Sequence, residues 1–217
     1  SAFIDCTSLT SVTIPDSVTA IGVGAFARCY GLNTFYGKYA SDDGRCLIID
    51  GTLKSFAPAG LTEYPIPDSV TTIGAHAFWD CDNLTSVTIP DGVTTIGRYA
   101  FCGCVGLKEV YCKPTTPPTM GGSVFGDAPF EAIYVPTASV DAYKSAYGWR
   151  DYADYIIGYD FDNGEIATPK PANNEIWYTS SDGEIVTPNT SNAFGATIVS
   201  NTYEDGKGVI TFDGDVT

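Results

Sequence analysis

The fold is decided by a 23-residue pattern that occurs three times in the chain. The copies are residues 9–31, LTSVTIPDSVTAIGVGAFARCYG; residues 61–83, LTEYPIPDSVTTIGAHAFWDCDN; and residues 84–106, LTSVTIPDGVTTIGRYAFCGCVG. A longer unit, residues 32–60, separates the first copy from the second, and a fifth unit begins at Leu107. Self-similarity at a fixed period of this length is typical of repeat architectures. We therefore expect each repeat to form one coil of a solenoid.

The apolar positions inside a repeat predict how a coil is built. Val12 and Ile14 are two residues apart, so both lie on one face of a strand. Pro15 then ends the strand, because proline cannot donate a ladder hydrogen bond. Further inward positions follow at Val18, Ile21, Phe26 and Cys29. One coil cannot bury these side chains alone, so they must stack on their counterparts in parallel strands about 4.8 Å apart.

The repeated pattern resembles a known family. L-x-x-V-x-I-P-x-x-V-x-x-I-G-x-x-A-F-x-x-C is similar to the BspA-type leucine-rich repeat of bacterial surface proteins, over about residues 1–106. Residues 107–161 resemble the C-terminal cap of such arrays. The resemblance implies a leucine-rich-repeat solenoid, β-rich with little helix, with a parallel β-sheet on one face and a short C-terminal helical cap. It also implies a bacterial cell-surface or secreted protein that engages host molecules.

The composition changes after the cap. We expect the solenoid with its cap over residues 1–161, a linker over residues 162–174 rich in Pro, Asn and Gly, and a small β unit over residues 175–217. Residues 175–179 and 184–187 flank Asp182-Gly183, which favours a hairpin. Residues 209–217 align with residues 11–19, so the last unit is expected to open a further repeat array. The chain is then expected to be a piece of a longer tandem protein.

The unit at residues 32–60 departs from the pattern. Two β-rich runs, residues 45–49 and 52–56, are joined by Asp50-Gly51, which favours a two-residue hairpin turn with positive φ. We expect this hairpin to replace the back of the coil. A wider turn without a ligand role is favoured over a ligand-binding loop.

The cap is predicted from a strand followed by a helix. Residues 132–136 form the last expected strand, and Thr137 is expected to N-cap a helix that runs to about Tyr147 and ends at Gly148. The residues expected to cover the end of the array are Val140, Tyr143, Tyr147, Trp149, Tyr152 and Ile156.

The cysteines and the histidine of the chain do not indicate a catalytic or metal site. Cys6, Cys29, Cys81 and Cys104 occupy one repeat position, and Cys112 stands where the repeat places an inward Ile, so we expect reduced core thiols. Cys102, Cys104 and Cys112 lack a fourth ligand at zinc-finger spacing, and we expect no metal and no cofactor. The single histidine, His76, is expected on an exposed loop. The chain is predicted not to be an enzyme.

The net charge of the chain limits the classes of partner that it is expected to bind. The chain has 26 acidic residues against 11 lysines and arginines, a formal net charge of −15. Nucleic acids and anionic membranes need basic surface, so neither is an expected partner. The chain also lacks an apolar run of about 20 residues, so no membrane insertion by this segment is expected.

The outward positions of the strands are the candidate binding site. They alternate with the buried pair and carry hydroxyls, tyrosine rings and acids, which suit an interface. The candidate residues are Thr34, Tyr36, Glu63, Ser86, Thr88, Glu109, Tyr111 and Tyr134. We predict a monomeric, non-catalytic binding scaffold for a protein or glycan ligand that acts in adhesion. Alternatives are a carbohydrate-binding module for nutrient capture, a structural spacer and an ordinary solvated sheet.

Overall fold

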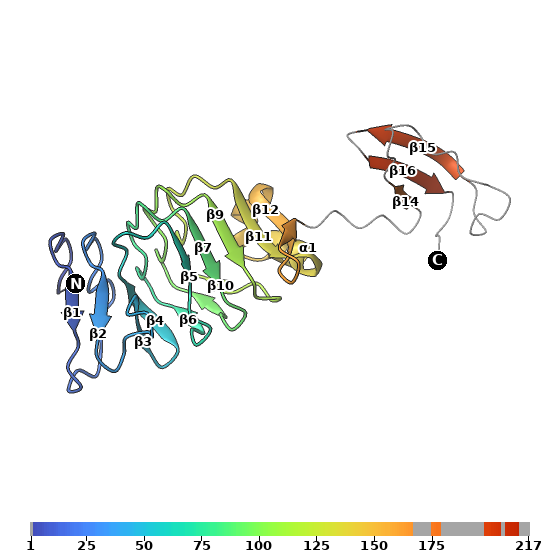
Figure 1. The fold of residues 1–217 in the computed structure, drawn as a ribbon. Coiled ribbons are helices and arrows are strands. Elements are labelled where there is room, and N and C mark those ends of the chain that lie inside the picture. Colours follow the sequence, from blue (N-terminus) through green and yellow to red (C-terminus); the bar gives the residue numbers. More distant parts are fainter. Residues whose placement is uncertain (1, 167–174, 179–197, 205–206, 213–217) are drawn as a thin grey trace. The chain divides into compact units, whose positions relative to one another are not determined.

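The computed structural model describes residues 2–166, 175–178, 198–204 and 207–212. The chain divides into two compact units, Ser1–Ala167 and Thr168–Thr217. The first unit contains the repeats and is a stack of coils (Figure 1). No helix in the described ranges is long and apolar enough to cross a membrane.

The front of the stack is a six-stranded sheet. Its strands, in spatial order, are β5 (Glu63–Pro65), β7 (Ser86–Ile89), β9 (Glu109–Cys112), β11 (Ala132–Pro136), β12 (Ile156–Asp160) and β13 (Glu165–Ile166). All pairs are parallel except β12 with β13. Val87 is paired with both Tyr64 and Val110, one repeat away on either side. The predicted solenoid with a parallel sheet on one face is confirmed.

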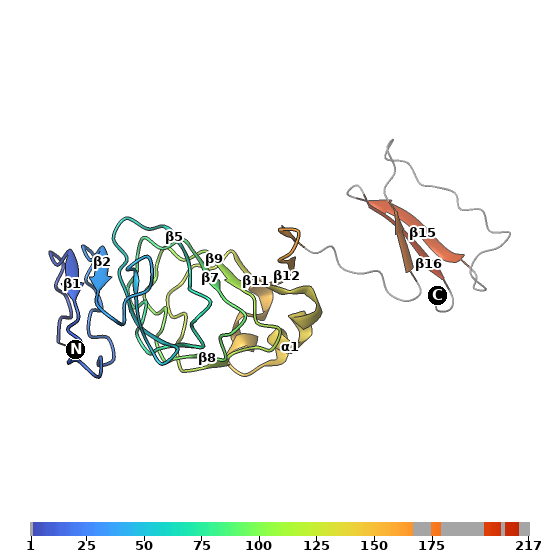
Figure 2. The same cartoon turned by 60° about the horizontal axis from the view of Figure 1, so that its bottom comes forward.

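A second sheet, which the sequence analysis did not predict, lies across the core from the first. It has the order β10 (Thr119–Met120), β8 (Thr95–Ile96), β6 (Thr72–Ile73), β4 (Thr52–Phe56) and β3 (Cys46–Ile49). Figure 2 shows β8 on the opposite side of the stack from β7 and β9. The coil spacing that pairs the front strands also brings Thr72 against Thr95 and Thr95 against Thr119. Two residues per coil are therefore enough to make a ladder.

The irregular unit interrupts the front sheet but not the stack. β1 (Ser11–Thr13) and β2 (Thr34–Tyr36) form their own two-stranded parallel sheet. The predicted hairpin is confirmed: β3 and β4 are antiparallel, and Asp50 and Gly51 between them have φ of 48° and 69°. β4 then pairs in parallel with β6. The hairpin thus supplies this coil's strand of the second sheet.

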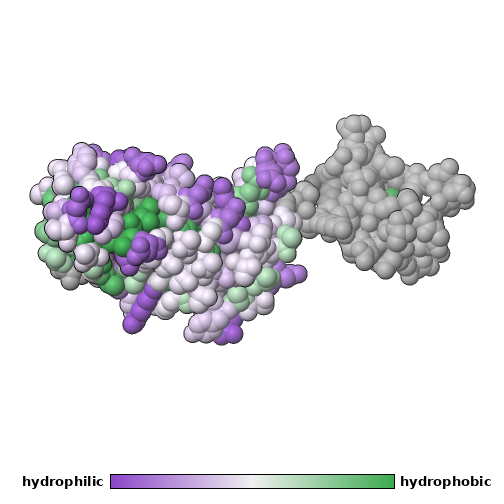
Figure 3. Space-filling model, turned by 90° about the horizontal axis from the view of Figure 1, so that it is seen from below, coloured by the Kyte–Doolittle hydropathy of each residue, from purple (hydrophilic) through white to green (hydrophobic). Residues whose placement is uncertain are grey.

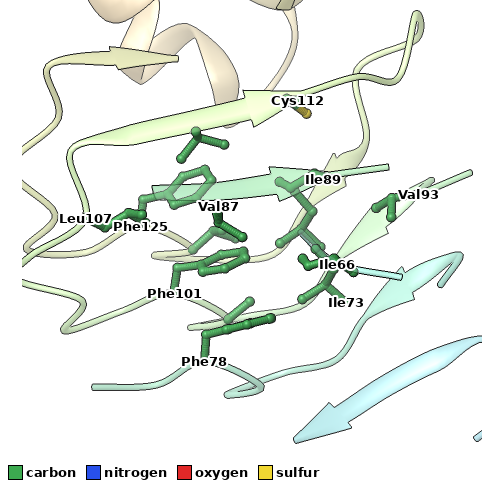
Figure 4. Close-up of a cluster of buried hydrophobic side chains, with 14 of the residues drawn as sticks. Ile66, Ile73, Phe78, Val87, Ile89, Val93, Phe101, Leu107, Cys112 and Phe125 are labelled. Atoms are coloured by element: carbon green, nitrogen blue, oxygen red, sulfur yellow. The ribbon is translucent and has the colours of Figure 1, made fainter. Parts of the chain in front are cut away.

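The core of the regular coils is a set of columns. Figure 4 shows Phe78, Phe101 and Phe125 one above the next, with ring centroids 4.7 Å and 5.4 Å apart. All three rings are at most 2% exposed. Phe26 instead stacks on Phe3 at 5.1 Å, in a second core cluster that belongs to the first coils. The columns are therefore continuous through the regular repeats and change at the irregular unit.

A column of glycines lets the coils approach each other. A Cβ at Gly74 would lie 2.6 Å from the carbonyl oxygen of Leu53, and one at Gly97 would lie 2.5 Å from the amide nitrogen of Ala75. Real Cβ atoms do not make such contacts. In the two regular copies the Gly that follows the second inward Ile is therefore a spacing requirement, whereas a Cβ at Gly22 of the first copy would meet nothing within 4 Å.

The cap differs in detail from the prediction. It contains the short helix α1 (Val140–Ser145) between two 3-10 segments, η1 (Thr137–Ser139) and η2 (Trp149–Tyr155). Thr137 lies inside η1, and no side chain caps α1, so the predicted N-cap is wrong. Because α1 ends at Ser145 and Ala146 is extended, Tyr147 is 78% exposed and does not join the covering face.

The aromatic cover itself is present. Trp149 is fully buried and donates a hydrogen bond from Nε1 to the carbonyl oxygen of Pro118, at 2.8 Å. Tyr143 is also fully buried and donates its hydroxyl hydrogen to the carbonyl oxygen of Pro114, at 2.7 Å. Both polar atoms are thus satisfied inside the apolar end of the stack.

The second unit is a small antiparallel sheet. Its order is β14 (Glu175–Tyr178), β16 (Lys207–Phe212) and β15 (Ile198–Glu204). β14 pairs with β16, and residues 184–187 of the expected hairpin lie outside the described residues. The expected boundaries of the linker, residues 162–174, stay a prediction. So does the expectation that residues 175–217 open a further repeat array.

The aromatic column predicts a large loss of stability on truncation. Replacing the fully buried Phe101 by Ala should lower the free energy of unfolding by about 3–5 kcal/mol, because it leaves a cavity between two rings. Val105→Ala, at a 56% exposed side chain, should change it by no more than about 0.5 kcal/mol. Denaturant titrations of the two variants measure the difference, and equal losses would contradict the column.

Candidate functional site

The strand face of the six-stranded sheet is the candidate site. Its outward residues lie in two rows that cross the strands. One row runs from Glu63 to Ser86 and Glu109, and the other from Pro65 to Thr88, Tyr111 and Tyr134. Six of the eight predicted residues therefore share one surface. Thr34 and Tyr36 lie on β2, in the separate sheet with β1, and the structure does not pair them with the rest.

Three tyrosine rings make one cluster at the C-terminal part of this face. The rings of Tyr111 and Tyr134 are stacked, with centroids 4.6 Å apart and planes 25° apart. Tyr159 on β12 contacts both, at 5.4 Å from Tyr111 and 5.2 Å from Tyr134. As a result Tyr134 is only 9% exposed, although it occupies an outward position.

The carboxylate of Glu109 joins the hydroxyls of this cluster. The Tyr111 hydroxyl donates to Oε2 at 3.3 Å, and the Tyr134 hydroxyl donates to Oε1 at 3.4 Å. The pKa of Tyr111 is raised to about 12, mainly by burial and then by the charge of Glu109. The same two causes raise the pKa of Tyr134. Both phenols therefore stay protonated donors at neutral pH.

Tyr159 was missed by the sequence analysis. Residues 156–160, IIGYD, lie at the end of the expected cap, and only Ile156 among them was expected to cover the array. In the structure Val135 pairs with Gly158, and Tyr159 extends the aromatic surface by one strand. The signal that could have indicated this strand was a β-rich run with an aromatic residue, placed after the last expected strand of the sheet.

Two shallow cavities open on the surface of the first unit, and only the first of them borders the strand face. One, of about 390 Å³, is lined by Asp91, Lys113, Pro136, Thr137, Ala138, Tyr159, Asp160, Phe161 and Asp162. The other, of about 400 Å³, is lined by residues 34–37 and 40–44 of the irregular unit. Both are mainly polar clefts open to solvent, so they widen the surface without forming an enclosed substrate pocket.

A third cavity is apolar and lies at the N-terminal coil. It has a volume of about 310 Å³, and Val12, Val18 and Ile21 line it. These side chains are half-buried, whereas their counterparts in the regular coils are fully buried. Figure 3 shows hydrophobic residues gathered in a hollow toward the N-terminal coils on one face. The cavity is lined mainly by apolar core positions, and Thr13 brings the one polar side chain of its lining.

Five of the seven cysteines are core thiols, and Cys6 and Cys102 are half-buried. All seven are free, and Cys29, Cys46, Cys81, Cys104 and Cys112 are buried. Burial raises the pKa of Cys46 and of Cys112 to about 12. Such thiols are protonated at neutral pH and make poor nucleophiles or metal ligands. Within the described part of the chain, no group of three or more His, Cys, Asp or Glu residues is placed to hold a metal ion.

His76 differs from its prediction. Its side chain is half-buried, with the ring 5.0 Å from that of Trp79 and 5.3 Å from that of Tyr99. Nδ1 is buried without a hydrogen-bond partner. Burial, and then the charge of Arg98, lower the pKa of the imidazole. The expected exposed loop is wrong because neighbouring aromatic rings cover the position.

A family model and several solved structures match the chain. The model, described as the BspA type leucine rich repeat region (6 copies), matches residues 1–39 and 52–148. The unmatched residues between these ranges include β3 and the turn of the hairpin. A search of the curated proteins found no match.

Three solved structures are similar over the repeats. A leucine-rich repeat protein from Eubacterium ventriosum has 23% identity and a TM-score of 0.40, over 61% of this chain and 44% of that one. A leucine rich cell surface protein from Faecalibacterium prausnitzii has 25% identity and a TM-score of 0.42, over 61% and 43%. The pneumococcal vaccine antigen PcpA has 15% identity and a TM-score of 0.45, over 60% and 40%. The chain thus spans less than half the length of each.

The buried thiols predict slow alkylation. In the native protein at neutral pH, Cys46 and Cys112 should resist iodoacetamide, because the reactive thiolate is scarce and covered. The half-buried Cys6 and Cys102 should react first, and all seven should react in denaturant. Mass spectrometry of the digested protein measures this. Disulfide-linked peptides in a non-reducing digest would contradict it.

The raised pKa of Tyr111 predicts a stability change in alkali. In the unfolded chain tyrosine ionises near pH 10, whereas Tyr111 in the fold ionises near pH 12. The contribution of neutral Tyr111 to the free energy of unfolding is therefore complete below pH 10 and is lost as the pH rises toward 12. Tyr111→Phe lacks this ionisable group, so its stability should fall less over that range. Parallel denaturant titrations at several pH values test the difference.

Proposed function

Because the chain belongs to the BspA-type leucine-rich repeat family, we propose that its repeats are a non-catalytic scaffold that binds partner proteins through the strand face. The observation that carries the proposal is the pair of outward rows across β5, β7, β9 and β11. Repeat proteins use such extended surfaces for binding. The setting we propose is the bacterial cell surface or the secreted state, in adhesion to a host protein.

The rigidity of the stack supports this role. Inward neighbours of the rows, such as Val87, Val110 and Ile133, are fully buried in the core. The strand face is therefore ordered before a partner arrives, which lowers the entropy cost of association. Tyrosine adds contact area with few rotatable bonds, and its hydroxyl adds hydrogen bonds.

The chemistry of the interior supports a binding role over catalysis. The thiols with the strongest burial are protonated, and the ring of His76 is held between Trp79 and Tyr99 rather than beside a nucleophile. A general base needs hydrogen-bond reach to the group that it activates. The open cleft beside the strand face and the open cleft in the irregular unit suit surface contact better than enclosure of a substrate.

The stacking of the tyrosines bears on the carbohydrate alternative. Sugars bind by lying against the free face of an aromatic ring, but Tyr111 and Tyr134 cover one face of each other. What the cluster offers to a partner is ring edges, one outer face and hydroxyls held by Glu109. A single free ring face beside hydroxyls and a carboxylate suits one polar side chain of a polypeptide.

The test combines three tyrosine substitutions. A Tyr111→Ser, Tyr134→Ser and Tyr159→Ser variant should bind a host matrix protein at least about tenfold more weakly, because tyrosine anchors each contribute on the order of 1 kcal/mol or more. Tyr147→Ser, at a 78% exposed ring outside the strands, is the matched control and should bind like the wild type. Surface plasmon resonance against a panel of matrix proteins gives the affinities.

Two results would count against the proposal. If the triple variant remains folded and binds every partner of the wild-type protein equally well, the strand face is not the site. If the wild type binds immobilised glycans and no protein in the panel, the carbohydrate alternative replaces protein binding.

A further inference from the structure

All charged side chains in the strands of the six-stranded sheet are carboxylates. The strands carry Glu63, Glu109, Asp160 and Glu165 and contain no lysine or arginine. The whole chain has a formal net charge of −15. Lys108, directly before β9, pairs with Glu131 at 2.7 Å. A surface of this kind attracts cationic partners and repels acidic ones.

Glu109 is the carboxylate best placed to hold such a cation. It is half-buried, and each of its oxygens already accepts a hydrogen bond from a tyrosine hydroxyl. A carboxylate has about four acceptor positions, so two hydroxyls do not fill it. Among the described residues no lysine, arginine or histidine forms an ion pair with Glu109. Its negative charge is therefore partly desolvated and not neutralised by a salt bridge in this part of the chain.

The rings beside Glu109 add a second attraction for a cation. Tyr111 remains half-exposed, and Tyr134 and Tyr159 pack around it within 5.4 Å. The face of an aromatic ring is negative and attracts lysine or arginine within about 6 Å of its centroid. A guanidinium is planar, so it can lie along a ring while its N–H groups fork onto a carboxylate.

We propose that Glu109, Tyr111, Tyr134 and Tyr159 form a receptor for an arginine side chain of a basic partner protein. The inference rests on the proposed function, because it names the partner's chemistry at the same strand face. Arginine fits better than lysine, whose ammonium is compact and strongly hydrated. The rows of Ser86 and Thr88 beside the cluster leave the partner's backbone room to cross the sheet.

The direct test uses a defined probe. A fluorescein-labelled octapeptide of alternating glycine and arginine is compared with the same peptide carrying citrulline, which keeps the shape but has no charge. Fluorescence anisotropy should give the arginine peptide an affinity at least about tenfold higher, as expected for one charge-assisted contact. The lysine peptide should lie between the two, and added salt should weaken the arginine peptide most.

Two glutamate variants locate the contact. Glu109→Gln keeps an oxygen that accepts the tyrosine hydroxyls but removes the charge, and it should weaken the arginine peptide by about tenfold. Glu165→Gln is the matched control, since Glu165 is an exposed glutamate on β13 outside the two rows. It removes an equal charge without the rings and should change the affinity less than about twofold. Glu109→Lys should abolish binding in a protein whose unfolding transition is unchanged.

The outcomes separate this inference from the proposed function. Equal losses for Glu109→Gln and Glu165→Gln would mean diffuse attraction and would overturn the receptor. A wild type that binds a matrix protein through the strand face but shows no preference for arginine over citrulline would also overturn it, while leaving the proposed function intact. Failure of the proposed function appears separately, as matrix-protein binding that the tyrosine triple variant does not alter.

Discussion

Parallel pairing between successive coils is the constraint on which the structure depends. When Val87 pairs with Val110, all remaining positions of one repeat are also brought over their counterparts in the next repeat. Phe78 then meets Phe101, and Gly74 and Gly97 meet a neighbouring backbone at a distance that excludes a side chain. The buried columns and the outward rows are two results of the same registration. A binding face and a core are thus specified together by one repeated segment.

The sequence predicted the architecture well where the signals are local. Alternation at Val12 and Ile14 and the Asp50-Gly51 signal both led to the correct local structure, because strand period and turn geometry are local properties. The second sheet escaped prediction since a two-residue strand has no period to detect. The helix end at Ser145 escaped it because no Gly or Pro marks that residue, so Tyr147 was assigned to the wrong environment.

The candidate site was predicted only in part, for a physical reason. Period-two alternation identified Glu109 and Tyr111 as outward residues, but it carries no information on contacts between strands. Whether two rings stand apart or stack depends on the twist of the sheet and on rotamers. Thr34 and Tyr36 were grouped with the others because the repeats align, yet the irregular unit ends the front sheet before β2. Tyr159 belongs to a strand outside the repeats altogether.

The hairpin of the irregular unit has a consequence for how the chain finds its fold. In an array of near-identical coils, a coil can in principle pair with the wrong neighbour, one repeat away from its native one. Residues 61–83 and 84–106, for example, offer almost the same contacts. Only one coil can supply β3 and β4 beside β6, and only one carries Asp43 within 3.1 Å of the hydroxyl of Tyr64. The hairpin therefore fixes the order in which the coils stack and disfavours topologies in which they are shifted by one repeat. Its removal would leave the native frame separated from a slipped one by a smaller energy gap.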